Sequence, residues 1–237
     1  MKNKTFFILL LLSMFSCSKP QLKSININNF DPIKFKKENL YIAPIINTSD
    51  IKLLNTSELY IEKLLKKYIK KFGFINSNEF TKILETKNLS SEYNKIQKLY
   101  VSGKLKNEDL GKLLPNLNSG YLVLTNISYF HINEYEDEQD VMVFDNKGEA
   151  DWATEVSRHI VSTIRGTFTL IDITSKEKVF DVEHEISKQN ISTHTERNCI
   201  DSIIAGLLGD LFKPKPIGPN KMVKIFFKQI IQNIPEK

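Results

Sequence analysis

The spacing of apolar residues along the chain predicts alternating helices and strands. Over residues 57–72, apolar residues recur every three or four positions and leave lysines on the other face, which is typical of an amphipathic helix. Ser57 can cap the start of this helix, and Gly73 can adopt the left-handed conformation that ends it. The same pattern predicts three more helices, which begin at Ser77, Ser90 and Asn107.

Three apolar runs predict strands in the first half of the chain. Residues 40–46 form a short run with Pro44 at its middle. Because proline cannot donate a ladder hydrogen bond, this strand should lie at a sheet edge or carry a bulge. Residues 74–76 are long enough only for a brief strand. Residues 121–130 are apolar at both sets of alternate positions, which predicts the buried centre of a sheet.

The second half of the chain predicts a long hairpin. Residues 156–174 place apolar side chains on one face of an extended segment. Residues 179–186 return with apolar side chains on the matching face, after a polar turn at 174–178. The two segments are therefore expected to pair as an antiparallel hairpin.

An acidic segment precedes this hairpin. It contains Glu134, Glu136, Asp137, Glu138 and Asp140, and a second turn follows at residues 145–148. Clustered carboxylates can bind Ca²⁺, but this spacing lacks the ligand positions and the glycine of an EF-hand loop. The segment is therefore predicted to be a solvated loop without a metal.

Two further amphipathic segments follow the hairpin. Residues 198–212 are rich in Ile and Leu and predict a helix, whereas the proline-rich residues 213–220 cannot be helical. Residues 222–234 again show helical spacing, with lysines on the polar face. This last helix could lie on a membrane surface or dock on the domain, and docking is the prediction.

The start of the chain has the layout of a secretory signal. Two lysines precede an apolar run over residues 6–15, and Ser16 leads into Cys17. The run is about half of the 20 residues that a transmembrane helix needs. The small residue before Cys17 resembles the lipobox of bacterial lipoproteins, which implies that acyl chains such as palmitate anchor the mature chain through Cys17. The following Ser18 is compatible with the outer membrane.

The boundaries of these segments divide the 237 residues into four parts. They are a signal peptide (residues 1–16), a lipid-anchored tether (17–38), an α/β domain (39–212), and a proline-rich linker with the C-terminal amphipathic helix (213–237). The tether is expected to pack only partly on the domain. Fully extended, it reaches on the order of 70 Å, so the domain must stay close to its membrane.

Composition and charge exclude some classes of protein and partner. With 41% hydrophobic and 10% aromatic residues, the chain can fill a core and is not a disordered chain. Loss of Lys2 and Lys4 with the signal lowers the formal net charge from +5 to +3. Binding of nucleic acid usually requires a concentrated basic face, so no nucleic-acid partner is predicted. Once Cys17 is acylated, Cys199 is the only other thiol, and no intrachain disulfide can form.

A search for catalytic groups gives no coherent site. His184 lies among acidic residues, but strand alternation turns it toward the apolar side chains, which predicts a core or edge histidine. His194 and Cys199 are five positions apart near a predicted helix start, and so lie on different sides. His131 and His159 stand alone in strands. The sequence has no nucleotide-binding, hydrolase or zinc-protease motif, so no catalytic residue, metal or cofactor is predicted.

Three segments resemble the α/β domain of the CsgG family and of the LpoB-type activators of penicillin-binding proteins, a domain similar to the N-terminal domain of TolB. They are residues 40–48 (LYIAPIINT), 111–127 (GKLLPNLNSGYLVLTNI) and 166–182 (GTFTLIDITSKEKVFDV). The resemblance implies an α/β fold with a mixed central sheet, a long antiparallel hairpin and flanking helices. It also implies a non-enzymatic role in the bacterial envelope.

The expected function is therefore that of a periplasm-facing adaptor or assembly factor that acts through contacts with an unidentified envelope protein. One alternative is a subunit of a homo-oligomeric, CsgG-like secretion channel, although Arg158 interrupts the apolar face of its candidate membrane hairpin, residues 141–165. The tether is also short for an activator that must reach across the periplasm. A hydrolase with a site assembled from distant loops is the other alternative.

Overall fold

The computed structural model describes residues 22–53, 57–70, 73–144, 147–196 and 213–235. The strands are β1 (Ser24–Ile27), β2 (Asn39–Ile42), β3 (Ile46–Asn47), β4 (Phe74–Ile75), β5 (Gly120–Phe144), β6 (Ala150–Asp172) and β7 (Glu177–Glu196). The α-helices are α2 (Pro32–Lys37), α3 (Ser57–Ile69), α4 (Ser77–Thr86), α5 (Ser90–Val101) and α7 (Pro219–Ile231). Two 3₁₀ turns, η1 (Asn107–Leu110) and η2 (Leu114–Asn116), precede β5.

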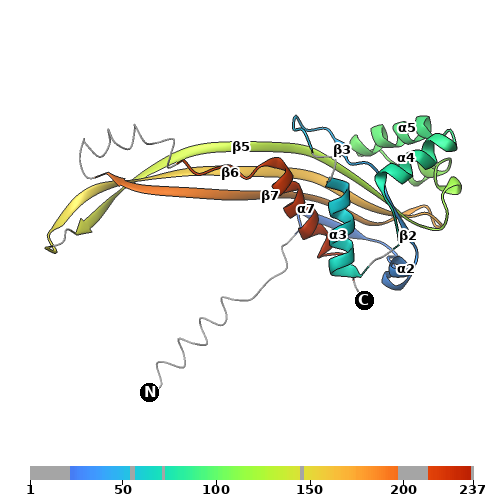
Figure 1. Ribbon diagram of the computed structural model, residues 1–237, viewed down its shortest axis with the longest axis horizontal. Helices are drawn as coiled ribbons and strands as arrows, with labels where there is room; N and C mark the ends of the chain where they lie inside the picture. Colours follow the sequence, from blue (N-terminus) through green and yellow to red (C-terminus); the bar gives the residue numbers. More distant parts are fainter. Residues whose placement is uncertain (1–21, 54–56, 71–72, 145–146, 197–212, 236–237) are drawn as a thin grey trace, which may run out of the picture.

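Within the described residues, the strands form one mixed, seven-stranded sheet (Figure 1). Its order is β1-β7-β6-β5-β2-β4, and β3 also pairs with β5. β2 runs parallel to β4 and β5, whereas β5, β6, β7 and β1 pair antiparallel. The predicted α/β fold, with a mixed sheet, a long antiparallel hairpin and flanking helices, is confirmed.

A helical layer covers each face of the sheet, and this explains why β5 is apolar on both sides. Tyr121 and Val123 lie in the core under α3 and α7, while Leu122 and Leu124 lie in the core under α4 and α5. All four side chains are at most 1% exposed. β5 lies between β6 and β2, so the prediction that residues 121–130 form the buried centre of the sheet is confirmed for residues 121–127, whereas Ser128 and Tyr129 are exposed.

The C-terminal helix α7 docks on the domain, as predicted. Its apolar stripe repeats every three or four residues and is buried against α3, β6 and β7. Phe226 and Phe227 are both 0% exposed, and their rings lie 5.5 Å apart. The lysines of α7 face outward. Burial of the apolar face, rather than helix propensity, therefore determines where α7 packs.

The strand over residues 40–46 is interrupted at Pro44, as the sequence predicts. Ile42 pairs with Val123, and Ile46 pairs with Asn126. Four steps along this strand therefore face three steps along β5, and the extra residue forms a bulge. The predicted brief strand at residues 74–76 is also present as β4.

Two helix predictions were wrong in detail. The fourth predicted helix, starting at Asn107, is replaced by η1 and η2, because Gly111 and Pro115 favour short turns over a continuous α-helix. Its apolar residues are nevertheless buried as expected. α3 ends at Ile69, and the residue in the left-handed conformation is Lys70, with φ 55°, not Gly73.

The prediction of a solvated acidic loop at residues 134–140 was wrong. β5 continues without a break to Phe144, and each residue of this segment faces a residue of β6. β7 likewise runs beyond Ile186 to Glu196. The ladder to β6 satisfies the backbone groups of both strands that point toward β6, while all the side chains of residues 134–140 remain exposed to water. Charged composition therefore did not prevent strand formation.

Residues 24–37, which are predicted to belong to the tether, fold onto the domain as β1 and α2. Asp31 caps α2 by accepting hydrogen bonds from the backbone of Ile33 and Lys34, at 2.8 and 3.0 Å. Phe35 is fully buried. Lys34 Nζ donates to Asp172 at 2.6 Å, and this hydrogen bond and charge raise the pKa of Lys34. The signal, Cys17 and the predicted helix over 198–212 lie outside the described residues.

Candidate functional site

The long strands continue past the helical layers as a three-stranded arm (Figure 1). We define the arm as residues 129–144 of β5, 150–165 of β6 and 185–196 of β7. β2 and β3 pair with β5 only up to Ile127, and β1 pairs with β7 only between Phe180 and Glu183. In the described residues, the outer edges of β5 and β7 along the arm thus have no neighbouring strand. Such edges are templates for pairing with another chain.

A β-bulge marks the point where the arm leaves the body. Ile127 pairs with Gly166 and Tyr129 with Arg165, so Ser128 is the extra residue. A Cβ added at Gly166 would lie 2.4 Å from the carbonyl oxygen of Asn126, so only glycine fits there without a shift. A bulge bends and twists its strand. Because β5 gains one residue here, its odd-numbered and even-numbered side chains exchange faces of the sheet beyond the bulge.

The arm face that continues the α7 side carries four carboxylates in a line along β5. This acidic row consists of Glu134, Glu136, Glu138 and Asp140. Arg158 Nε lies 2.7 Å from Glu136 Oε1, and Lys213 Nζ lies 3.4 Å from Glu134 Oε2. A cavity of about 270 Å³ lies between these groups and Pro214. Along β7, the same face carries Lys188, the uncharged polar residues Asn190 and Ser192, and His194, with one acid, Glu196, at its end.

The opposite face of the arm holds a compact histidine cluster. The His159 ring stacks on Tyr135 with a centroid distance of 4.6 Å and an interplanar angle of 2°. His159 Nε2 lies 2.5 Å from Asp137 Oδ1, and Gln189 contacts both His159 and Tyr135. The prediction that His159 stands alone was therefore wrong. Cross-strand pairing brings these groups together from three strands, which no local motif shows.

The end of the arm exposes large apolar side chains. Met142, Phe144 and Trp152 are 52%, 63% and 63% exposed. Met142 faces Trp152 across the two strands, and Phe144 lies two residues further along the same face. Exposed apolar groups gathered at one end of an element are typical of a contact surface.

The body holds two adjoining polar cavities beside Asp181. One has a volume of about 530 Å³ and is lined mainly by residues 26–29, Asn107, Glu177 and Lys178. The other is about 240 Å³, and Tyr100 and Thr167 are among its lining residues. Tyr100 Oη donates to the carbonyl oxygen of Leu124 at 3.1 Å, and burial raises its pKa. This phenol stays neutral and hydrogen-bonded, which is typical of a structural role.

The other sequence candidates take structural roles in the described residues. His184 is 4% exposed, packs on Phe226 and lies 2.8 Å from Gln229 Oε1, so the prediction of a core histidine is confirmed. His194 Nε2 lies 2.8 Å from Glu196 Oε1 in β7. Cys199, its candidate partner, lies outside the described residues, as does the lipidation candidate Cys17.

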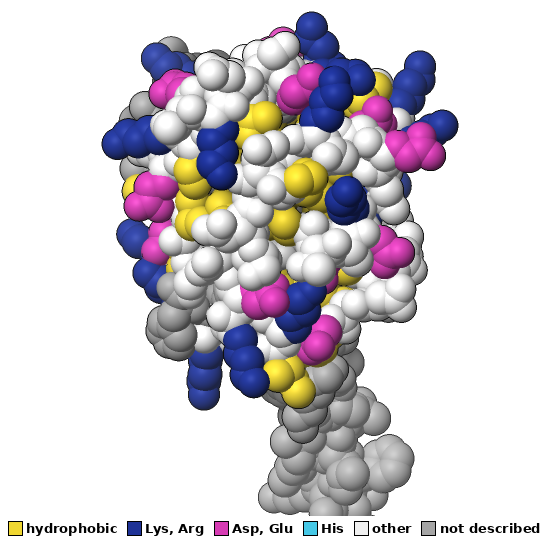
Figure 2. Space-filling view, turned by 90° about the vertical axis from the view of Figure 1, so that its right-hand side faces the viewer, with side chains coloured by type: hydrophobic (Ala, Val, Ile, Leu, Met, Phe, Trp, Pro, Cys, Tyr) yellow, Lys and Arg dark blue, Asp and Glu magenta, His cyan; other side chains and the backbone are white. Residues whose placement is uncertain are grey.

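The part of the chain that the structure describes contains no candidate metal cluster and no candidate membrane-spanning helix. It contains no group of three or more His, Cys, Asp or Glu side chains placed to hold a metal ion. None of its helices has the length and apolar character that a bilayer crossing requires. At the end of the body shown in Figure 2, lysine and acidic side chains alternate over the surface and form no field of one sign.

Comparisons with known proteins found only distant similarities, all of them to solved structures. No family model matches the sequence, and a search of curated proteins found no match. Among solved structures, the chain is similar to the lipoprotein GNA1162 from Neisseria meningitidis, with 7% identity, a TM-score of 0.29, and coverage of 73% of this chain and 96% of that one. It is also similar to the PelC dodecamer from Paraburkholderia phytofirmans, with 10% identity, a TM-score of 0.30, and coverage of 81% and 99%.

Proposed function

We propose that this chain is a non-enzymatic lipoprotein of the bacterial envelope that faces the periplasm and acts as an adaptor or assembly factor. Lipidated Cys17 would hold the mature chain in the outer membrane, and the arm would make the protein contacts. The observation that carries this proposal is the arm itself. It extends beyond both helical layers, leaves two strand edges open and ends in exposed apolar side chains.

A second copy of the chain is the partner that the charges of the arm favour. Pairing of β5 with β5 of another copy would place the acidic row against itself, and like charges directly opposite destabilise a sheet. Pairing of β5 with β7 instead brings Glu138 and its neighbours near Lys188 and uncharged polar residues. This head-to-tail contact is heterologous, so it closes into a ring when the rotation between copies allows.

Proline substitutions on β5 test the open edge. Backbone N–H groups of consecutive residues point to opposite sides of a strand, so one of Glu138→Pro and Gln139→Pro removes a donor to β6 and the other a donor on the open edge. The open-edge variant should keep the thermal unfolding of the wild type but lose its complexes in detergent, measured by mass photometry. The other variant should unfold at a lower temperature. Unchanged complexes in a folded open-edge variant would contradict the proposal.

A cross-linking experiment separates head-to-tail pairing from other contacts. Chains with Glu138→Cys and chains with Lys188→Cys, both carrying Cys199→Ser, are mixed and treated with a bis-maleimide. A dimer that forms only in the mixture supports pairing of β5 with β7. A dimer of the Glu138→Cys chain alone would show β5–β5 contacts, and a conjugate of different mass would identify an adaptor bound to another protein.

Mass spectrometry of the native protein tests the anchor. The proposal expects a mature chain that begins at Cys17 and carries the added mass of acyl chains. A Cys17→Ala chain should lose this mass. A native product with its leader intact and an unmodified thiol would overturn the lipoprotein assignment, whatever the arm binds.

A further inference from the structure

The outward faces of α3 and α7 form a basic surface that the proposed arm contacts do not use. It consists of Lys63, Lys66, Lys67 and Lys70 along α3 and its end, and Lys221, Lys224 and Lys228 along α7. We name this set the lysine surface. All seven side chains are exposed, and their spacing of three or four residues places each group on one helix face. α7 contains no acidic residue.

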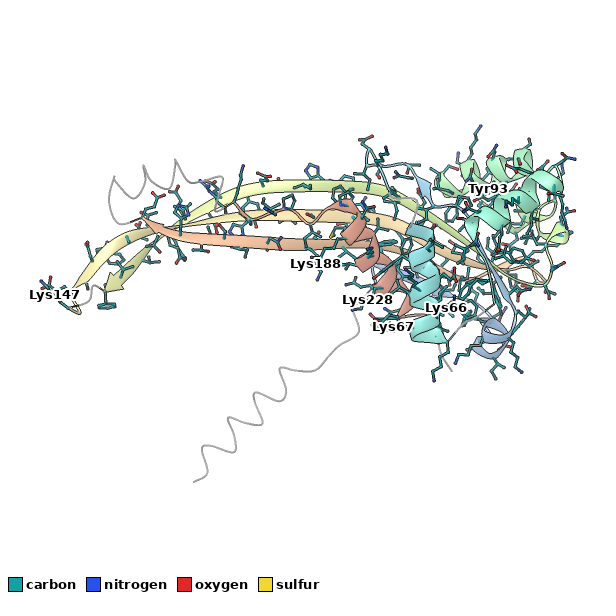
Figure 3. All side chains as sticks on the ribbon, in the orientation of Figure 1. Lys66, Lys67, Tyr93, Lys147, Lys188 and Lys228 are labelled. Atoms are coloured by element: carbon teal, nitrogen blue, oxygen red, sulfur yellow. The ribbon has the colours of Figure 1, made fainter. Side chains whose placement is uncertain are left out.

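The two helices lie side by side, so the two rows of lysines are continuous. α3 and α7 contact each other, and Lys224 Nζ lies 5.1 Å from the ring centre of Tyr60 on α3. Figure 3 shows Lys66, Lys67 and Lys228 on the side of the sheet opposite Tyr93 of α5. Among the ion pairs of the described residues, only that of Lys66 with Glu62 involves the lysine surface. The positive charge of this surface is therefore largely uncompensated.

Helix stability does not account for this arrangement of charge. Lysines in the last turn of a helix interact favourably with the helix dipole, and Lys66 and Lys67 in α3 and Lys228 in α7 fit this explanation. Lys221, however, lies in the first turn of α7, where positive charge opposes the dipole. The positive charge in the first turn of α7 is thus better explained by an anionic partner than by the helix itself.

The start of the described chain lies beside the lysine surface. The backbone N–H of Lys23 donates to His184 Nδ1 at 3.3 Å, and His184 Nε2 lies 2.8 Å from Gln229 of α7. Lys23 is six positions after Cys17, so the chain between them spans at most about 20 Å. An anchor at Cys17 would therefore keep α7 close to the lipid headgroups.

We propose that the lysine surface lies against an anionic phospholipid membrane, with the phosphate headgroups as its ligand. This inference rests on the proposed function for the position of the anchor, but the lysines can be tested without it. Basic side chains near a surface attract anionic lipid, and their contributions accumulate along a helix face. The anchor would hold the domain at the membrane, and the lysine surface would set its orientation, with the arm left available for partners.

Vesicle binding by the mature, non-acylated chain tests the surface directly. The chain carries Cys17→Ser, so that no acyl group contributes, and is sedimented with vesicles of phosphatidylcholine alone or mixed with phosphatidylglycerol. We expect binding at least about tenfold tighter to the anionic vesicles, and weaker binding at high salt. Replacing Lys63, Lys67, Lys224 and Lys228 by Gln should remove this preference.

The matched control replaces four exposed lysines on the other helical layer and its loop, Lys82, Lys95, Lys98 and Lys104, by Gln. It loses the same charge and should keep the preference for anionic vesicles. Equal losses in both variants would show attraction by net charge alone and would overturn the proposal. Equal binding to both vesicle types, or stronger binding to a soluble polyanion such as heparin than to vesicles, would also overturn it. Because acylation is absent from this experiment, these outcomes leave the assignment of Cys17 unaffected.

Discussion

Gly166 shows how one position can govern the junction between the body and the arm. It lies opposite Ile127 at the bulge, and a Cβ at this position would be 2.4 Å from the carbonyl oxygen of Asn126 and 3.1 Å from Phe226. The backbone of Asn126 belongs to the adjacent strand and cannot move without disturbing the ladder. Glycine is therefore retained for close approach rather than for an unusual backbone angle.

Substitution of this glycine should destabilise the protein. We expect Gly166→Ala to lower the free energy of unfolding by about 1–3 kcal/mol, because the added methyl overpacks the junction. Chemical denaturation measured by circular dichroism gives the value. Gly218→Ala is the control, since nothing lies within 4 Å of its added Cβ. A Gly166→Ala chain as stable as the control would show that the junction relaxes without cost.

Tyr100 gives a prediction for alkaline pH. Its hydroxyl hydrogen-bonds to the carbonyl of Leu124 and to Thr169 Oγ1, and burial raises its pKa above the ordinary value of 10.0. Above pH 10 the unfolded chain loses this proton while the folded chain keeps it, so the contribution of Tyr100 to stability falls as pH rises. At neutral pH, Tyr100→Phe should cost about 1–2 kcal/mol through the lost hydrogen bonds.

The difference between the two chains should therefore shrink above pH 10. Urea denaturation of the wild type and Tyr100→Phe at a series of pH values checks this, because the remaining tyrosines and lysines titrate alike in both chains. A difference that stays constant from neutral to alkaline pH would mean that the phenol ionises in the folded state as easily as in the unfolded chain.

At the scale of elements, burial of its apolar face holds α7 on the domain. Phe226 is 0% exposed and lies between Phe227 and His184, with ring distances of 5.5 and 6.2 Å. Phe226→Ala should lower the free energy of unfolding by about 3–5 kcal/mol, since it removes apolar contacts and leaves a cavity. Lys228→Ala, on the exposed face of the same helix, should change it by less than about 0.5 kcal/mol.

Guanidinium unfolding followed by far-ultraviolet circular dichroism compares these two variants. Similar losses for both would mean that α7 is held by its charges and not by its apolar face.

At the scale of the whole molecule, the body and the arm have different roles. The two hydrophobic cores lie under the helical layers, and most of the arm lies outside them. Replacement of residues 134–160 by Asn-Gly would close the hairpin after Asn133, which pairs with Val161, through a two-residue turn. This shortened chain should still unfold cooperatively, although β7 beyond Gln189 loses its partner strand and should fray.

The same chain should lose the complexes that the full arm forms. Calorimetry reports the folding of the body, and mass photometry in detergent reports assembly. Complexes of unchanged stoichiometry would assign assembly to the body and not to the arm. A shortened chain without a cooperative transition would show that the arm is required for folding, which contradicts its proposed role as an interaction element.

The local pattern of apolar residues was sufficient to predict most of the helices, the central strand and the core position of His184, because periodic burial depends mainly on nearby residues. It also predicted that the strand at Pro44 lies at a sheet edge or carries a bulge, and that the C-terminal helix docks on the domain. It was insufficient for residues 134–140, whose charge indicated a loop. Their strand conformation depends on pairing with β6, whose partner residues are distant in the sequence.

The contact surfaces depend still more on tertiary structure. The sequence by itself determined the alternation of apolar positions, the candidate anchor at Cys17 and the lysine stripes of α3 and α7. Only the tertiary structure decided that β5, β6 and β7 extend into an arm with open edges, that His159 meets Asp137, and that the two lysine stripes become one surface. The physical reason is that side-chain periodicity is local, whereas strand pairing and helix packing join residues far apart in the chain.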